Sequence, residues 1–180
     1  LFILNFSHVA HSLTTTATVC VLIFGISLIL LYTTSGIYHL VKAKDAVILR
    51  LKKLDHSMIF VLIAGSYTPF CLIGLKGIIG WITFSVISTI AICGVLFKMI
   101  WFNCPRWIST SIYIGMGWIS IFIIVPLYNS IALGGIALLV LGGILYTIGA
   151  VIYGLKPRAL KFKNLGFHEI FHIFILLGSL

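Results

Sequence analysis

Long stretches without a charged residue constrain this chain more than any other feature. No Asp, Glu, Lys or Arg occurs between Trp107 and Leu155, and shorter stretches of the same kind fill most of the remaining sequence. A helix needs about 20 mostly apolar residues to cross the hydrocarbon core of a bilayer. Because 61% of the residues are hydrophobic and 8% are charged, the sequence predicts an all-α integral membrane protein and excludes a soluble globular fold.

Charges, prolines and polar clusters divide the sequence into six apolar segments. Pro126, Asn129 and Ser130 mark the turn that splits the long uncharged stretch into two spans. The last segment is short for a span, and residues 1–6 resemble the end of an earlier helix. We therefore expect a seven-transmembrane helix bundle, here truncated at both ends, that forms a single domain over residues 1–180. The expected segments are residues 14–41, 55–75, 77–101, 107–125, 130–154 and 165–180.

The basic residues predict how the chain is oriented in the membrane. Twelve basic residues stand against three acidic ones, a balance that in a soluble protein suggests nucleic-acid binding. Here the basic residues lie in short gaps between apolar segments, which is typical of cytoplasmic loops. Because successive gaps between spans lie on alternate sides of the membrane, eleven basic residues are expected on one side and only Lys76 on the other. We expect a plasma-membrane protein with cytoplasmic basic loops and no nucleic-acid partner.

One stripe of small residues predicts close helix packing. Gly135, Gly142 and Gly149 recur every seven residues in the fifth segment, so they share one helix face. Small residues on a common face let helices approach closely in lipid.

The ionisable side chains of the segments gather at one end. Charged and imidazole groups are costly inside a bilayer, so each is a functional candidate by default. All of them fall at segment ends on the basic side, where they could meet at one depth. They are His39, Asp55, His56, His168, Glu169 and His172.

Two of these histidines have the spacing of metal ligands. His168 and His172 are four residues apart, which places two imidazoles on one face of a helix. His39 could supply a third ligand and leave a fourth position for water, as in catalytic zinc sites. Asp55 could orient or deprotonate that water, and Ser35, one turn before His39, could contact a substrate oxygen.

Each assignment has a simpler structural alternative. Asp55 could be a helix N-cap, and the Ser35 hydroxyl could bond a carbonyl of its own helix. Glu169 would be favoured in a first helical turn by the helix dipole alone. His56, like His8 and His11, could lie in a loop or at the membrane interface.

The last segment also matches a protease motif. Residues 168–172 read H-E-x-x-H, in which two histidines bind zinc and the glutamate acts as general base. A membrane-embedded zinc protease is therefore a rival interpretation, with Asp55 as a further ligand.

Three stretches of the sequence resemble one known family. Residues 32–40 (YTTSGIYHL), 54–70 (LDHSMIFVLIAGSYTPF) and 166–179 (GFHEIFHIFILLGS) are similar to signature stretches of bacterial hemolysin III family proteins. These belong with the progestin and adipoQ receptor family, in a superfamily that includes alkaline ceramidases. The resemblance implies a seven-helix bundle with zinc near the cytoplasmic face, held by His39, His168 and His172. The family's motifs also include the positions of Ser35 and Asp55, and the resemblance implies that Asp55 holds the zinc-bound water.

These observations lead to one function and two alternatives. By analogy with the ceramidase relatives, we expect a zinc-dependent hydrolase of lipid amide or ester bonds, with a membrane lipid as substrate or ligand. The alternatives are the pore-forming cytolysin that the family name records and a sensor of membrane state in which zinc is structural. An open water position on the zinc would favour catalysis, and a fourth protein ligand would favour a structural role.

Overall fold

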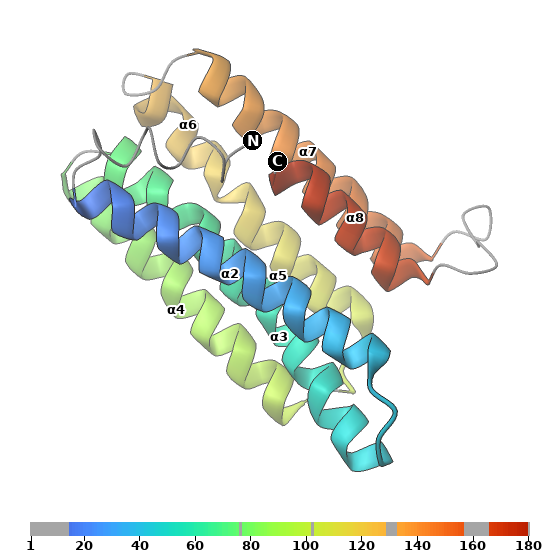
Figure 1. Ribbon diagram of the computed structural model, residues 1–180. Coiled ribbons are helices and arrows are strands. Elements are labelled where there is room, and N and C mark those ends of the chain that lie inside the picture. Colours follow the sequence, from blue (N-terminus) through green and yellow to red (C-terminus); the bar gives the residue numbers. More distant parts are fainter. Residues whose placement is uncertain (1–14, 76, 102, 129–132, 157–165, 180) are drawn as a thin grey trace. The chain divides into compact units, whose positions relative to one another are not determined.

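The computed structural model describes residues 15–75, 77–101, 103–128, 133–156 and 166–179, and every element in these ranges is helical. Five helical stretches are long and apolar enough to cross a membrane, and a shorter apolar helix ends the described chain (Figure 1). The prediction of an all-α integral membrane protein is confirmed. The chain divides into two compact units, Leu1–Asn103 and Cys104–Leu180. His8, His11 and Lys76 lie outside the described residues.

The first unit is built around one long central helix. It contains α2 (Thr15–Leu40), α3 (Asp45–Pro69), the short π-helix η1 (Phe70–Gly74) and α4 (Ile78–Ile100), and α3 packs against both α2 and α4. A Cβ atom at Gly65 of α3 would collide with the Ser27 side chain of α2, and one at Gly94 of α4 would collide with the Phe60 ring of α3. Glycine at these positions therefore lets the helices approach closely.

Helix α3 begins ten residues before the expected start of the second segment. The N-cap is Lys44, and α3 together with η1 covers 30 residues. At 1.5 Å per residue that is about 45 Å, against a hydrocarbon core of about 30 Å. The early turns of α3, which carry Arg50, Lys52 and Lys53, account for the length of the helix beyond the thickness of the hydrocarbon core. The helix therefore begins before the apolar segment expected from Asp55, because charged residues such as these can extend a helix.

The far end of α3 changes helix type before the chain turns. Pro69 lacks a backbone N–H, and the next five residues form η1, closed by a hydrogen bond from Leu75 N to Phe70 O of 2.9 Å. Gly77 follows with φ of 78°, a conformation that favours glycine. Gly80 then lets α4 start against the Leu75 carbonyl, because a Cβ atom at this position would lie 2.8 Å from that oxygen.

The second unit is built around α7. It contains α5 (Arg106–Trp118), α6 (Ser120–Tyr128), α7 (Leu133–Leu155) and α8 (Phe167–Ser179), and α7 packs against both α5 and α8. The Trp118 indole donates to Thr147 Oγ1 at 3.4 Å, joining α5 to α7. The hydroxyls of Tyr146 and Ser179 lie 2.6 Å apart and join α7 to α8.

Pro126 does not end the fourth span. It lies inside α6, which continues to Tyr128, because membrane helices tolerate proline where their other polar groups find partners. The break in this span comes earlier, at Ile119, where Ser120 Oγ donates to Gly117 O at 2.7 Å. The expected turn residues Asn129 and Ser130 lie outside the described residues.

Two glycines of the predicted stripe pack against α8. A Cβ atom at Gly142 would lie 2.9 Å from Gly178 O, and one at Gly149 would lie 2.6 Å from the Cβ of Phe174. The predicted packing role is confirmed for these two residues.

Candidate metal centre

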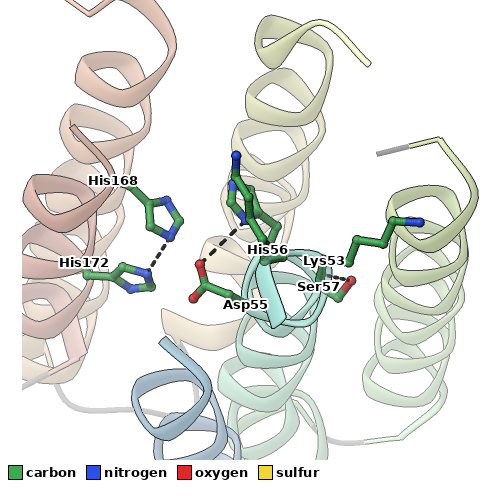
Figure 2. A network of polar contacts seen from close by, with 7 residues as sticks. Lys53, Asp55, His56, Ser57, His168 and His172 are labelled. Atoms are coloured by element: carbon green, nitrogen blue, oxygen red, sulfur yellow. Dashed lines mark hydrogen bonds and ion pairs between the residues drawn. The ribbon is translucent and has the colours of Figure 1, made fainter. Parts of the chain in front are cut away.

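The clearest candidate metal ligands are the two histidines of α8. The Nε2 atoms of His168 and His172 lie 3.1 Å apart, and their rings meet edge to face with centroids 4.6 Å apart (Figure 2). This arrangement follows from their spacing, since residues four apart on a helix share a face. Without a metal, the protonated nitrogen of one ring can donate a hydrogen bond to the unprotonated nitrogen of the other.

The geometry of this pair fits a zinc ion. Two imidazole nitrogens bound at 2.0–2.1 Å to a tetrahedral zinc lie about 3.3–3.4 Å apart, close to the 3.1 Å between His168 Nε2 and His172 Nε2. Imidazole nitrogen is also one of the ligands that zinc prefers. Small ring rotations would therefore allow both residues to bind one ion.

Aromatic side chains hold the histidine pair in place. The Tyr153 ring of α7 lies 5.5 Å from the His168 ring and 5.5 Å from the Phe171 ring, centroid to centroid. Gly149 permits this contact because its missing side chain lets α8 approach α7 there. His172 is 8% exposed. Neighbouring aromatic rings limit the rotamers open to the two histidines.

Glu169 lies against the start of its own helix. A Cβ atom at Gly166 would collide with the Glu169 carboxylate, so this carboxylate folds back over the first turn of α8. An acidic group at a helix N-terminus is stabilised by the unpaired N–H groups and the helix dipole. This placement favours the structural interpretation of Glu169 over the role of a protease base.

Asp55 is buried in the interior of α3. It is 0% exposed and lies ten residues beyond the first residue of the helix. The N-cap alternative for Asp55 is therefore wrong, because Lys44 holds that position. A carboxylate buried this deeply needs hydrogen bonds or a positive partner to stay ionised. Its burial makes Asp55 a functional candidate that N-capping does not explain.

His56 lies beside Asp55 and was underestimated by the sequence reasoning. It is 8% exposed in α3, and its Nδ1 lies 2.8 Å from Lys52 O and 3.6 Å from Asp55 Oδ2 (Figure 2). The loop alternative for His56 is wrong, because α3 starts earlier than predicted and includes this residue. Donation to the Lys52 carbonyl places the proton on Nδ1 when the ring is neutral. The adjacent Asp and His in the sequence were the signal for this pair.

Ser35 and His39 lie near the end of α2. Ser35 is buried at 7% exposure, whereas His39 is exposed in the last turn, with its ring 4.7 Å from the Tyr38 ring. Their spacing of four residues places both on one helix face. Within the first unit, the site residues are thus supplied by α2 and α3, which pack together.

The fold and these side chains define a multi-pass helical membrane protein with buried histidines and a buried aspartate in its helices. Comparison with known proteins identifies the group within that class: the family described as Haemolysin-III related matches residues 1–180, and the chain belongs to this family. It is 41% identical over 161 residues to the "Hemolysin-3 homolog" of Bacillus subtilis (strain 168), covering 87% of this chain and 70% of the relative.

A second relative gives the same assignment. The chain is 41% identical over 175 residues to the "Hemolysin-3" of Bacillus cereus, covering 96% of this chain and 75% of that protein. No solved structure gives a significant match.

Proposed function

We propose that the protein is a zinc-dependent hydrolase that cleaves an amide or ester bond of a membrane lipid. The observation that carries this proposal is the pair His168 and His172, whose Nε2 atoms converge to 3.1 Å among aromatic side chains of α7 and α8. Imidazoles at this spacing on a membrane helix are suited to one metal ion.

The proposed ligands of the zinc are His39, His168 and His172. The third histidine rests on the resemblance to the hemolysin III family, whose motifs fall on these positions. Because the set takes residues from both compact units, the proposal requires that residues 1–180 form a single transmembrane domain. Three protein ligands would leave one position of a tetrahedral site for the reaction.

The chain's own residues supply the proton transfers. Zinc, when bound, polarises a carbonyl group and lowers the pKa of water to about 7. In the proposed reaction a carboxylate oxygen of Asp55 accepts a proton from the attacking water. It then delivers the proton to the departing amine or alcohol as the carbonyl carbon–nitrogen or carbon–oxygen bond breaks. The Ser35 hydroxyl donates to the carbonyl oxygen, which becomes negative as water attacks.

The proposed orientation places this chemistry at the cytoplasmic face. The described basic residues of the first unit lie near the end of α2, in the early turns of α3 and in the last turn of α4: Lys42, Lys44, Arg50, Lys52, Lys53 and Lys98. Retention of basic loops in the cytoplasm is the general rule for inner-membrane proteins. Labelling of a cysteine introduced by Lys44→Cys, in a variant whose four native cysteines are replaced, tests this orientation in intact cells and in inverted membrane vesicles. Labelling from outside intact cells would contradict it.

Turnover of labelled lipids tests the hydrolase proposal. The full-length protein in detergent is supplied with a ceramide that carries a fluorescent acyl chain, and separately with a phosphatidylglycerol that carries the same chain. Release of the labelled fatty acid is expected from at least one of them. Asp55→Asn should abolish this release and retain the metal, whereas Asp45→Asn, on the same helix but in its exposed first turn, should leave both unchanged. Equal turnover in the Asp55→Asn variant would remove Asp55 from the mechanism.

Glu169→Gln tests whether Glu169 is the general base, as the H-E-x-x-H motif of the protease interpretation would require. A protease of the H-E-x-x-H type loses its general base in this variant. In the proposed lipid hydrolase the Glu169 carboxylate supports the start of α8 and takes no part in the reaction, so turnover should fall by much less than the hundredfold or more that loss of a general base causes. Loss of lipid turnover by a factor of about a hundred or more, with zinc retained, would assign the general-base role to Glu169 and contradict the role proposed for Asp55.

A cytolysin is the second candidate, because both relatives carry the name hemolysin. A pore needs a continuous polar lining, whereas the exposed side chains of the described spans include many large apolar groups such as Ile29, Ile92 and Leu138. Release of an entrapped dye from phosphatidylglycerol vesicles distinguishes the two. Release that persists in the Asp55→Asn variant would support the cytolysin and contradict the hydrolase as the source of lysis.

A further inference from the structure

The first unit carries an apolar groove that the proposed metal chemistry does not use. Its volume is about 480 Å³, and three helices line it: α2 from Ile23 to Leu30, α3 from Val61 to Thr68, and α4 from Phe84 to Leu96. Its rims are exposed, since Ile26, Ile92 and Leu96 are 53%, 61% and 54% exposed. The groove therefore opens on the surface of the described residues.

Two hydroxyl groups in the groove form hydrogen bonds to backbone carbonyls of their own helices. Ser27 Oγ donates to Phe24 O at 2.7 Å, and Thr68 Oγ1 donates to Ala64 O at 3.0 Å. The groove thus presents hydrocarbon to its occupant. Because it lies between three candidate membrane spans, the hydrocarbon available to fill it is that of the bilayer.

The width of the groove suits one hydrocarbon chain. On α4 it extends over twelve residue steps, from Phe84 to Leu96, or about 18 Å. Dividing the volume of about 480 Å³ by this length gives a mean cross-section of about 27 Å². A helix with side chains is about 10–12 Å across and needs about 80–110 Å². A polymethylene chain, whose carbons contact neighbours at about 4 Å, needs about 20 Å² or less.

A lysine ammonium lies just beyond one end of the groove. Lys53 Nζ donates to Met99 O at 2.8 Å in a solvent-exposed contact, and Met99 is less than one helical turn beyond Leu96, the last groove residue on α4. An ammonium has three donors, so further hydrogen bonds can go to an anion. Further basic residues lie in the loop before α3 and in the early turns of α3, namely Lys42, Lys44, Arg50 and Lys52.

The groove lies on a different side of the helices from the candidate metal-site residues. At 100° per residue, Asp55 is about 130° around α3 from the centre of the groove face. On α2, Ser35 and His39 are about 130° and 170° from it by the same construction. The groove is therefore a separate location from the one where Ser35, His39 and Asp55 would act.

We propose that this groove binds one acyl chain of an anionic membrane phospholipid, with the lipid phosphate bound by Lys53 Nζ at the end of the groove. The apolar lining favours the chain, the mean cross-section is close to that of one chain and smaller than that of a helix, and the basic residues near this end of the unit favour a negative headgroup. The site does not depend on zinc or on hydrolysis, and its failure would leave the proposed function untouched.

Native mass spectrometry of the full-length protein in detergent tests this site. The probes are dioleoyl phosphatidylglycerol, dioleoyl phosphatidylcholine and oleic acid, each titrated separately. Phosphatidylglycerol is expected to bind tighter than the other two. Lys53→Gln should weaken phosphatidylglycerol binding about fivefold, the effect of one cation near a headgroup, and weaken phosphatidylcholine binding less, because the choline cation offsets the charge of its phosphate. Lys44→Gln, in the loop before α3, is the matched control and should have a smaller effect.

Filling the groove provides the second arm. Ser88→Phe places a ring inside the groove, whereas Val86→Phe places the same ring on an exposed position of α4 outside it. Ser88→Phe should reduce phosphatidylglycerol binding about tenfold or more with zinc content unchanged, and Val86→Phe should not. Ser88→Leu is a milder filling variant if the phenylalanine variant fails to fold.

Three results would overturn the proposal. Equal phosphatidylglycerol affinity in Ser88→Phe and Val86→Phe would show that the groove is not the site. If oleic acid bound as tightly as phosphatidylglycerol and its affinity were unchanged in Lys53→Gln, the groove would be a fatty-acid site without headgroup recognition. A dimer lost specifically on Ser88→Phe would show that a second copy of the chain covers the groove.

Discussion

The packing of α8 on α7 gives a prediction whose size follows from a single glycine. In Gly149→Ala the new Cβ atom would lie 2.6 Å from the Cβ of Phe174 and 3.4 Å from Cδ2 of Phe171. The first of these neighbours is fixed to the backbone and cannot rotate away. Restoring an ordinary carbon contact of about 3.5–4.0 Å requires α8 to move by about 1 Å. Overpacking of this kind costs about 1–3 kcal/mol.

A second glycine on the same helix, Gly143, provides a control for the effect of helix propensity on stability. Both alanine variants gain about 1 kcal/mol of helix propensity, but a Cβ atom at Gly143 has no neighbour within 4 Å. Gly149→Ala should therefore be less stable than Gly143→Ala by about 1–3 kcal/mol, measured as the free energy of unfolding by SDS titration in mixed micelles. Equal stabilities would refute the close approach of α8 to α7 at this position.

Three further predictions use the same titration. Thr110→Val should raise the free energy of unfolding by about 1 kcal/mol, because Thr110 Oγ1 is buried with no hydrogen-bond partner among the described residues; a loss of stability would show that the hydroxyl has one. Tyr146→Phe should lower it by about 1 kcal/mol through loss of the 2.6 Å contact with Ser179, and an unchanged value would contradict that contribution. Gly94→Ala should lower it by about 1–3 kcal/mol against the fully buried Phe60 ring; a gain would mean that the ring can yield.

The spans were predictable from the sequence because the bilayer imposes a length and a composition. The expected segments 14–41 and 77–101 agree with α2 and α4 to within a residue or two. The start of α3 was not predictable from charge, since Arg50, Lys52 and Lys53 favour helix in water and are costly only when buried. Pro126 failed as a boundary for a related reason, because a membrane helix retains its remaining backbone hydrogen bonds around a proline.

The candidate site was predictable where it depends on spacing along one helix. The contact between His168 and His172 follows from four residues of separation. The burial of His56 was missed because it depends on where α3 begins. The apolar groove was also missed, since it requires three helices to be placed together before its lining can be recognised.

Metal analysis of the purified full-length protein tests the central claim most directly. The wild-type protein and Glu169→Gln should each hold about one zinc per chain, and the double variant His168→Ala/His172→Ala should hold none, because three-histidine sites do not survive the loss of two ligands. A wild-type protein purified without chelators that contains no zinc would contradict the account. So would zinc retained in full by the double variant, since the ion would then be bound by other residues.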